Sequence, residues 1–88
     1  MTRFRQNPDF PATILGGEAA IVTPVDSRLH VLNGVATRVW ELCEGEGIEF
    51  AELLSALLDE FDVAEADAAS ETREFLADGV RRGFILED

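Results

Sequence analysis

Short apolar runs rich in β-branched residues dominate the first third of the chain, and each run ends at a glycine, a proline or a polar turn. Runs bounded in this way predict β-strands. Gly16-Gly17 joins the first two runs and is a strong hairpin signal. The residues from Val25 to Arg28 supply the next turn. The pattern therefore predicts an antiparallel meander of three strands, over residues 10–15, 18–23 and 29–32.

After residue 33 the apolar side chains recur at the three- to four-residue spacing of helices. Asn33 is a favourable N-cap for the first helix, whereas Glu49 is a poor N-cap for the second. Gly83 is a natural residue just past the end of the third helix. The pattern predicts helices over residues 34–43, 50–61 and 65–82, followed by an extended tail at Phe84–Leu86.

These six elements predict an α+β fold with a winged-helix-like outline, in which a three-stranded antiparallel sheet is followed by three helices. Residues 1–88 have the length of a single domain. Residues 1–8 show no strand or helix signal and are expected to form a flexible N-terminal arm. They also lack the apolar core of a signal peptide. No apolar run approaches the roughly 20 residues of a spanning helix, so a cytoplasmic location is the simplest interpretation.

The chain is strongly acidic, with a formal net charge of −11 at pH 7, and all seven of its basic residues are arginine. Most of the acidity lies in the second half, where residues 41–88 hold fifteen Asp or Glu against three Arg. Nucleic-acid backbones and anionic membranes require a basic face, so this balance argues against both as partners. It also weakens the alternative of a DNA-binding winged helix, which the outline of the fold would otherwise favour.

Candidate catalytic chemistry is scarce in this sequence. It has one His, one Cys and no Tyr or Lys, and it shows no phosphate-cradling glycine loop and no metal-ligand motif. We therefore expect no catalysis, no cofactor and no metal. Trp40 and Cys43 fit the apolar face of the first helix and are expected in the core. An acidic carrier protein is an alternative, because Asp26-Ser27 resembles the start of a phosphopantetheine attachment motif, although Arg28 follows where that motif has Leu.

One stretch is more informative than the elements around it. Residues 32–42, Leu-Asn-Gly-Val-Ala-Thr-Arg-Val-Trp-Glu-Leu, resemble the Leu-Asn-x-x-Ala-x-x-hydrophobic-Trp-x-Leu signature of the PqqD family. A glycine-centred hairpin precedes the signature, as in that family. The features that follow are Glu60-Phe61-Asp62-Val63, an acidic residue four before Phe75-Leu76, and Arg82-Gly83-Phe84-Ile85. The resemblance covers residues 8–86, nearly the whole chain.

The resemblance implies a RiPP recognition element, a peptide chaperone that binds the leader segment of a ribosomally made precursor peptide. In this family the leader adds as a strand beside the third strand, in a cleft against the third helix. The modifying enzyme would be a separate protein, such as a radical SAM enzyme or a peptidase or cyclase. The final product of the modification would be pyrroloquinoline quinone or another modified peptide. The chain is expected to be a monomer or a weak dimer. Glu71, Gly79 and Glu49 stand where the family usually has Asp, Leu and Thr, and Gly79 leaves the shape of the cleft open.

The third strand is an edge strand if the meander keeps its sequence order, and an unpaired edge invites the addition of a peptide strand. The alternative is a short edge that Arg28 protects from pairing. Of the two flanks of the third helix, the one with Glu71 is favoured, and a solvated helix face is the alternative. For His30 an ordinary strand role is the simpler interpretation. The candidate peptide-binding residues are Arg28, Leu29, His30, Val31, Leu32, Glu71, Phe75, Asp78 and Arg82, and the opposite flank carries Ala69, Arg73, Leu76 and Val80.

Overall fold

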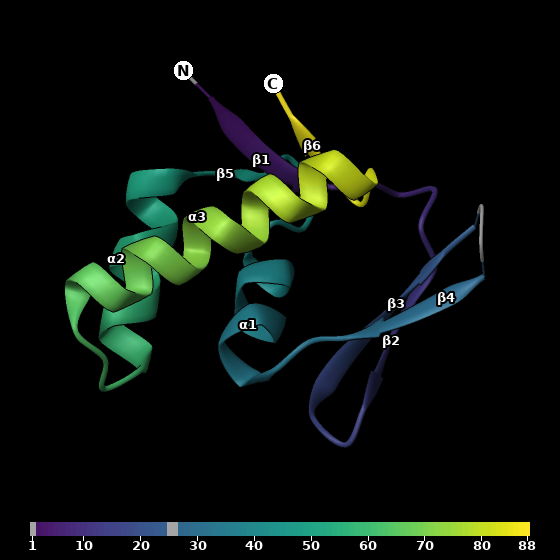
Figure 1. Ribbon diagram of the computed structural model, residues 1–88. Helices are drawn as coiled ribbons and strands as arrows, with labels where there is room; N and C mark the ends of the chain where they lie inside the picture. Colours follow the sequence, from purple (N-terminus) through teal and green to yellow (C-terminus); the bar gives the residue numbers. More distant parts are fainter. Residues whose placement is uncertain (1, 25–26) are drawn as a thin grey trace.

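The computed structural model describes residues 2–24 and 27–88, which form two small antiparallel sheets and three helices (Figure 1). The strands are β1 (Arg3–Gln6), β2 (Ala12–Leu15), β3 (Glu18–Thr23), β4 (Arg28–Val31), β5 (Ile48–Glu49) and β6 (Ile85–Glu87). The helices are α1 (Gly34–Leu42), α2 (Phe50–Glu60) and α3 (Glu65–Arg82). The predicted α+β class with antiparallel strands and three helices is confirmed.

The predicted meander is the sheet β2-β3-β4, with β3 at its centre. Ile14 pairs with Ala19 across the first hairpin, and Ile21 pairs with His30 across the second. Ala19 and Ile21 are fully buried and belong to the hydrophobic core. The second predicted turn contains Val25 and Asp26, which lie outside the described residues. The carrier-type motif that begins at Asp26 therefore lies partly outside them too.

A second sheet, of order β5-β1-β6, was not predicted from the sequence. The prediction of a flexible arm at residues 1–8 was wrong, because this segment contains strand β1. Within that segment Arg3–Gln6 is the central strand, and Phe4 pairs with Ile48 on one side and Glu87 on the other. The side chain of Gln6 donates a hydrogen bond to the carbonyl oxygen of Trp40 at 2.6 Å. This sheet brings the two ends of the described chain together at the top of Figure 1.

The helix ends follow the predicted capping chemistry. Asn33 Oδ1 accepts a hydrogen bond from the Ala36 amide at 2.8 Å, which caps α1. Gly83 ends α3 in the left-handed region at φ +96°. Glu49 precedes α2 but makes no side-chain cap bond, as expected for a poor N-cap. Within the described residues, no helix has the length and apolar character needed to cross a membrane.

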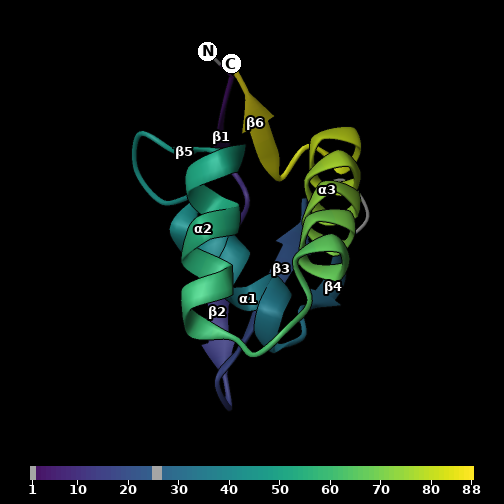
Figure 2. The same cartoon turned by 90° about the vertical axis from the view of Figure 1, so that its left-hand side faces the viewer.

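The core lies where the three helices meet β3 and the segment that leads into β6 (Figure 2). Phe84 is 2% exposed and is at its centre, with ring centroids 6.1 Å from Trp40 and 5.8 Å from Phe75. Trp40 and Cys43 are buried there, as the sequence predicted. Its buried hydrophobic members are Ala19, Ile21, Leu32, Val39, Trp40, Cys43, Leu53, Leu57, Leu76, Phe84 and Ile85.

Gly79 lies at the contact between α3 and the segment that leads into β6. A Cβ atom at this position would be 2.5 Å from Ile85 Cγ1 and 3.0 Å from Phe84 Cε1. The missing side chain therefore lets the C-terminal segment approach the helix closely. It does not open space in the cleft, because Gly79 is absent from the residues that line the pocket on α3 described below.

Candidate functional site

Strand β4 is at the edge of its sheet, as the sequence predicted. The amide of Leu32 donates to the carbonyl oxygen of Ala19 at 2.8 Å, in register with the β3–β4 pairing. Backbone groups of alternate residues on an antiparallel strand point to opposite sides. The N–H and C=O groups of Leu29 and Val31 therefore point away from β3, toward the open edge. This edge presents a main-chain pattern that a further strand can pair with.

The side chains of β4 also divide between two faces. Leu29 and Val31 point to the face opposite the helices and are 55% and 58% exposed. His30 points to the helical side, where its ring centroid is 6.3 Å from that of Phe84. In the described structure its Nε2 atom is buried and has no hydrogen-bond partner. The helical side of the edge thus combines an aromatic contact with a polar atom that has no partner.

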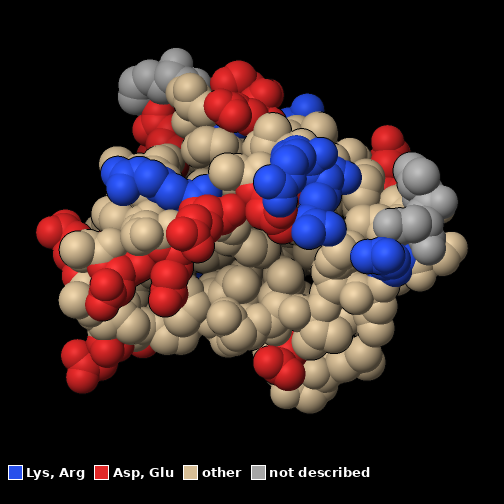
Figure 3. Space-filling view, viewed as in Figure 1, with Lys and Arg blue, Asp and Glu red and all other residues tan. Residues whose placement is uncertain are grey.

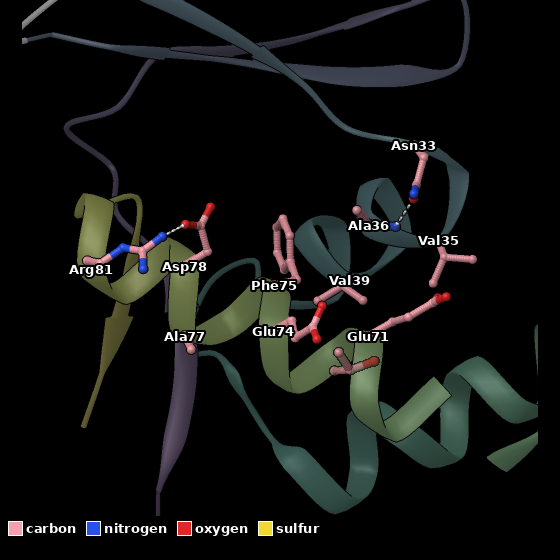
Figure 4. A pocket seen from close by; sticks show the side chains of 11 residues that line it. Asn33, Val35, Ala36, Val39, Glu71, Glu74, Phe75, Ala77, Asp78 and Arg81 are labelled. Carbon is pink, nitrogen blue, oxygen red and sulfur yellow. Dashed lines mark hydrogen bonds and ion pairs between the residues drawn. The ribbon is translucent and has the colours of Figure 1, made fainter. Parts of the chain in front are cut away.

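A pocket of about 700 Å³ lies between α3 and the first turns of α1, which directly follow β4 (Figure 4). Val39 and Phe75 form much of its apolar wall, and Glu71 and Glu74 supply carboxylates. Its lining residues are Asn33, Val35, Ala36 and Val39 from α1 and its cap, and Glu71, Thr72, Glu74, Phe75, Ala77, Asp78 and Arg81 from α3. The pocket thus extends the helical side of the β4 edge at its C-terminal end.

The charges along α3 are unevenly compensated. Asp78 Oδ2 accepts a hydrogen bond from Arg82 Nε at 2.8 Å, and Asp78 is also paired with Arg81. Glu71 and Glu74 have no hydrogen bond or ion pair within the described part of the chain. Figure 3 shows acidic side chains in a row along α3 with basic side chains at the end of that row, and an uncharged surface below it. The pocket therefore carries an uncompensated negative charge.

The predicted site residues occupy two adjoining parts of this region. Glu71, Phe75 and Asp78 line the pocket. Arg82 does not line it but holds Asp78. Arg28, Leu29, His30, Val31 and Leu32 form the neighbouring strand edge and its continuation, and Leu32 itself is buried.

The opposite flank of α3 faces other neighbours. Ala69 and Leu76 are buried against the rest of the fold. Arg73 lies over the ring of Phe50 at 4.9 Å, and with Val80 it lines a smaller pocket of about 290 Å³ beside β1. The flank with Glu71 is therefore the one that shares a pocket with the residues following β4.

Sequence reasoning did not identify the contribution of α1, namely Asn33, Val35, Ala36 and Val39. Chain connectivity gave only a partial signal: two residues separate the end of β4 from the start of α1, so the first turn of α1 lies near the end of that strand. Thr72 and Glu74 were also not predicted to line the pocket, because tertiary packing decides which turns of α3 face α1.

Reactive groups are few in this region. Burial raises the pKa of the Cys43 thiol to about 12, and this side chain is fully buried in the core. A thiol with such a pKa stays protonated at neutral pH and is a poor nucleophile. Among the described residues, no three His, Cys, Asp or Glu side chains are grouped closely enough to hold a metal ion.

The fold and part of the sequence match known proteins. Two solved structures share the fold, each at 18% sequence identity. They are described as "TbiB1 in Complex with the TbiA(beta) Leader Peptide" (TM-score 0.78, covering 92% of this chain and 93% of that one) and "Lasso peptide synthetase B1 complexed with the leader peptide" (TM-score 0.79, 96% and 98%). Comparison with curated proteins finds no match. The family model described as "Coenzyme PQQ synthesis protein D (PqqD)" matches residues 18–85, which confirms the resemblance seen in residues 32–42 and shows that this chain belongs to the PqqD family.

Proposed function

We propose that this protein is a stand-alone recognition element that binds the leader segment of a ribosomally made precursor peptide and presents it to a separate modifying enzyme. The open edge of β4 beside the pocket on α3 is the observation that carries this proposal. Membership of the PqqD family supports it. Both solved structures with this fold are described as complexes with leader peptides, which supports it further.

In the proposed complex the leader is an extended strand next to Arg28–Leu32. Its main chain pairs with the outward N–H and C=O groups of Leu29 and Val31, which gives affinity with little dependence on sequence. Alternate side chains of the leader point to the helical side and contact the flank that bears Glu71, Phe75 and Asp78. Arg82 acts indirectly, because it positions the carboxylate of Asp78.

In this role the chain performs no catalysis itself. The winged helix-turn-helix fold holds a peptide rather than DNA, because the acidic row along α3 (Figure 3) would repel a phosphate backbone. The enzyme partner is a radical SAM enzyme or a peptidase or cyclase, and the product is pyrroloquinoline quinone or another modified peptide. We place the complex in the cytoplasm and expect the free protein to be a monomer or a weak dimer.

Proline substitution at the β4 edge tests the strand-addition model. Val31→Pro removes an outward N–H, so it should block pairing with the leader while leaving the β3–β4 bonds intact. His30→Pro would instead remove an N–H that faces β3 and would weaken the sheet itself. The matched control is Ile14→Pro on β2, the other edge strand. Ile14 pairs with Ala19, whose backbone groups face β4. The N–H of Ile14 therefore also points away from the sheet, and its loss leaves the β2–β3 bonds intact.

The peptides to titrate are synthetic products of the short reading frames beside the gene, added to ¹⁵N-labelled protein. A true leader should shift the amide resonances of β4, α3 and the first turn of α1. Losing one main-chain bond and adding a steric clash in Val31→Pro should weaken binding at least about 10-fold, whereas Ile14→Pro should bind normally. Equal affinity of the two folded variants would rule out strand addition at β4.

A further inference from the structure

The pocket beside the β4 edge has two kinds of wall. Its apolar part is formed by Val39, which is 1% exposed, together with the half-buried Val35, Ala36 and Phe75. Figure 4 shows Phe75 and Val39 close together at the centre of the pocket, with Val35 at one end. This wall can cover an aliphatic chain several methylenes long.

The polar part of the pocket is acidic and uncompensated. Glu71 and Glu74 are three residues apart on α3, so they are neighbours on the helix surface and repel each other. Figure 4 shows Glu71 extending toward Val35, so its carboxylate lies beside the apolar wall. Asp78 shows the contrasting case, because two arginines hold it. A single cation entering the pocket would relieve the repulsion between Glu71 and Glu74.

A buried hydroxyl gives an independent indication that something binds here. Thr72 lines the same pocket and is 1% exposed, and its Oγ1 atom has no hydrogen-bond partner in the described structure. A buried polar atom without a partner is uncommon, because leaving it unbonded is unfavourable. A ligand with an N–H donor would supply the missing partner.

We propose that the pocket holds one lysine or arginine side chain of the bound peptide, with its stem on Val39 and Phe75 and its charged head between Glu71 and Glu74. Lysine and arginine are the side chains that combine an aliphatic stem with a cationic donor. The residue concerned lies opposite the C-terminal end of β4, where peptide side chains on the helical side point toward Asn33 and the pocket. This inference rests on the proposed function and names a feature of the peptide that it recognises.

The probe is a displayed library of random 12-residue peptides, selected against the folded protein without knowledge of the natural leader. The peptides retained should share one Lys or Arg at a constant spacing from apolar residues. When the same library is selected for binding to the variant Glu71→Gln/Glu74→Gln, the retained peptides should no longer share a Lys or Arg. The matched control is Glu44→Gln/Glu46→Gln, which removes the same charge from the exposed loop between α1 and β5 and should keep it.

A double-mutant cycle on one selected peptide then tests the contact itself. Replacing its conserved Lys by norleucine keeps the stem and removes the charge, and should weaken binding to the unmodified protein about 10-fold. The same replacement should have almost no effect on binding to Glu71→Gln/Glu74→Gln. That variant should fold at least as well as the original, since it loses a like-charge repulsion.

The outcomes separate this inference from the proposed function. Selected peptides that lose binding in Val31→Pro but share no basic residue would overturn the basic anchor and leave leader binding at β4 in place. A conserved basic residue whose norleucine effect is the same in both proteins would also overturn it, because the charge would then act elsewhere. Selected peptides that bind Val31→Pro and Ile14→Pro equally well would overturn the proposed function and the anchor together.

Discussion

The buried thiol of Cys43 predicts how the stability of this fold depends on alkaline pH. Burial raises the pKa of the thiol from 9.0 to about 12, so the folded protein keeps it neutral where the unfolded chain ionises it. A group whose folded pKa is raised contributes stability that is present below the unfolded pKa and is lost as pH rises toward the folded pKa. The free energy of unfolding should therefore fall between pH 9 and pH 12.

The composition isolates this effect from other titrations. The sequence contains no Lys and no Tyr, which are the other side chains that ordinarily titrate near pH 10. With the pKa values of 9.0 and about 12 for the Cys43 thiol, linkage gives a loss of about 2 kcal/mol between pH 7.5 and pH 10.5. A domain of this length has a free energy of unfolding of about 4–13 kcal/mol, so the loss is easily measured.

The assay is urea unfolding followed by the fluorescence of Trp40, which is the only tryptophan and is 5% exposed. From pH 7.5 to pH 10.5 the midpoint should fall by about 1–2 M urea. Cys43→Ala should be less stable than the original protein at pH 7.5, because it leaves a cavity in the core, but its midpoint should stay constant over this range. A midpoint of the original protein that does not move, or a variant that loses stability equally with pH, would refute the assignment to Cys43.

Three further predictions concern the fold that holds the site. Gly79→Ala should lower the free energy of unfolding by about 1–2 kcal/mol, because the clash with Ile85 and Phe84 outweighs the gain in helix propensity; a more stable variant in urea unfolding would contradict this. Asn33→Ala should cost about 1 kcal/mol by removing the cap of α1, and hydrogen exchange should show faster exchange at the Ala36 amide. Deleting residues 2–7 removes β1, and should lower the midpoint of thermal unfolding by more than about 10 °C; an unchanged midpoint would mean that the second sheet contributes little.

The elements that could be predicted from the sequence are those with a clear local signal. Apolar runs bounded by Gly16-Gly17 and by Asn33 predicted β2, β3, β4 and the start of α1. β1 was missed because Arg-Phe-Arg-Gln is mostly polar and only four residues long. Its partners β5 and β6 have two and three residues, and their pairing depends on contacts more than forty positions apart, which no local pattern reveals.

The same limit applies to the candidate site. The flank of α3 with Glu71, Phe75 and Asp78 could be predicted, because helical spacing places these three side chains together and they line one pocket. The wall from α1 could not be read from periodicity, since Val35 and Val39 belong to the apolar stripe that also faces the core. Only the packing of α1 against α3 decides which part of that stripe stays open.

The features that a purely structural role leaves unexplained converge on one region of the molecule. The two buried side-chain atoms without a hydrogen-bond partner in the described residues are His30 Nε2 and Thr72 Oγ1, one on β4 and one on the wall of the pocket. The unpaired Glu71 and Glu74 lie beside Thr72, and the outward backbone groups of β4 lie next to His30. Departures from packing and pairing rules are expected where a chain is shaped for a ligand rather than for stability alone. A peptide strand at β4 with one basic side chain in the pocket would pair the open edge and neutralise the two carboxylates beside Thr72 in a single binding event, which a solvated edge and a solvated helix face would not.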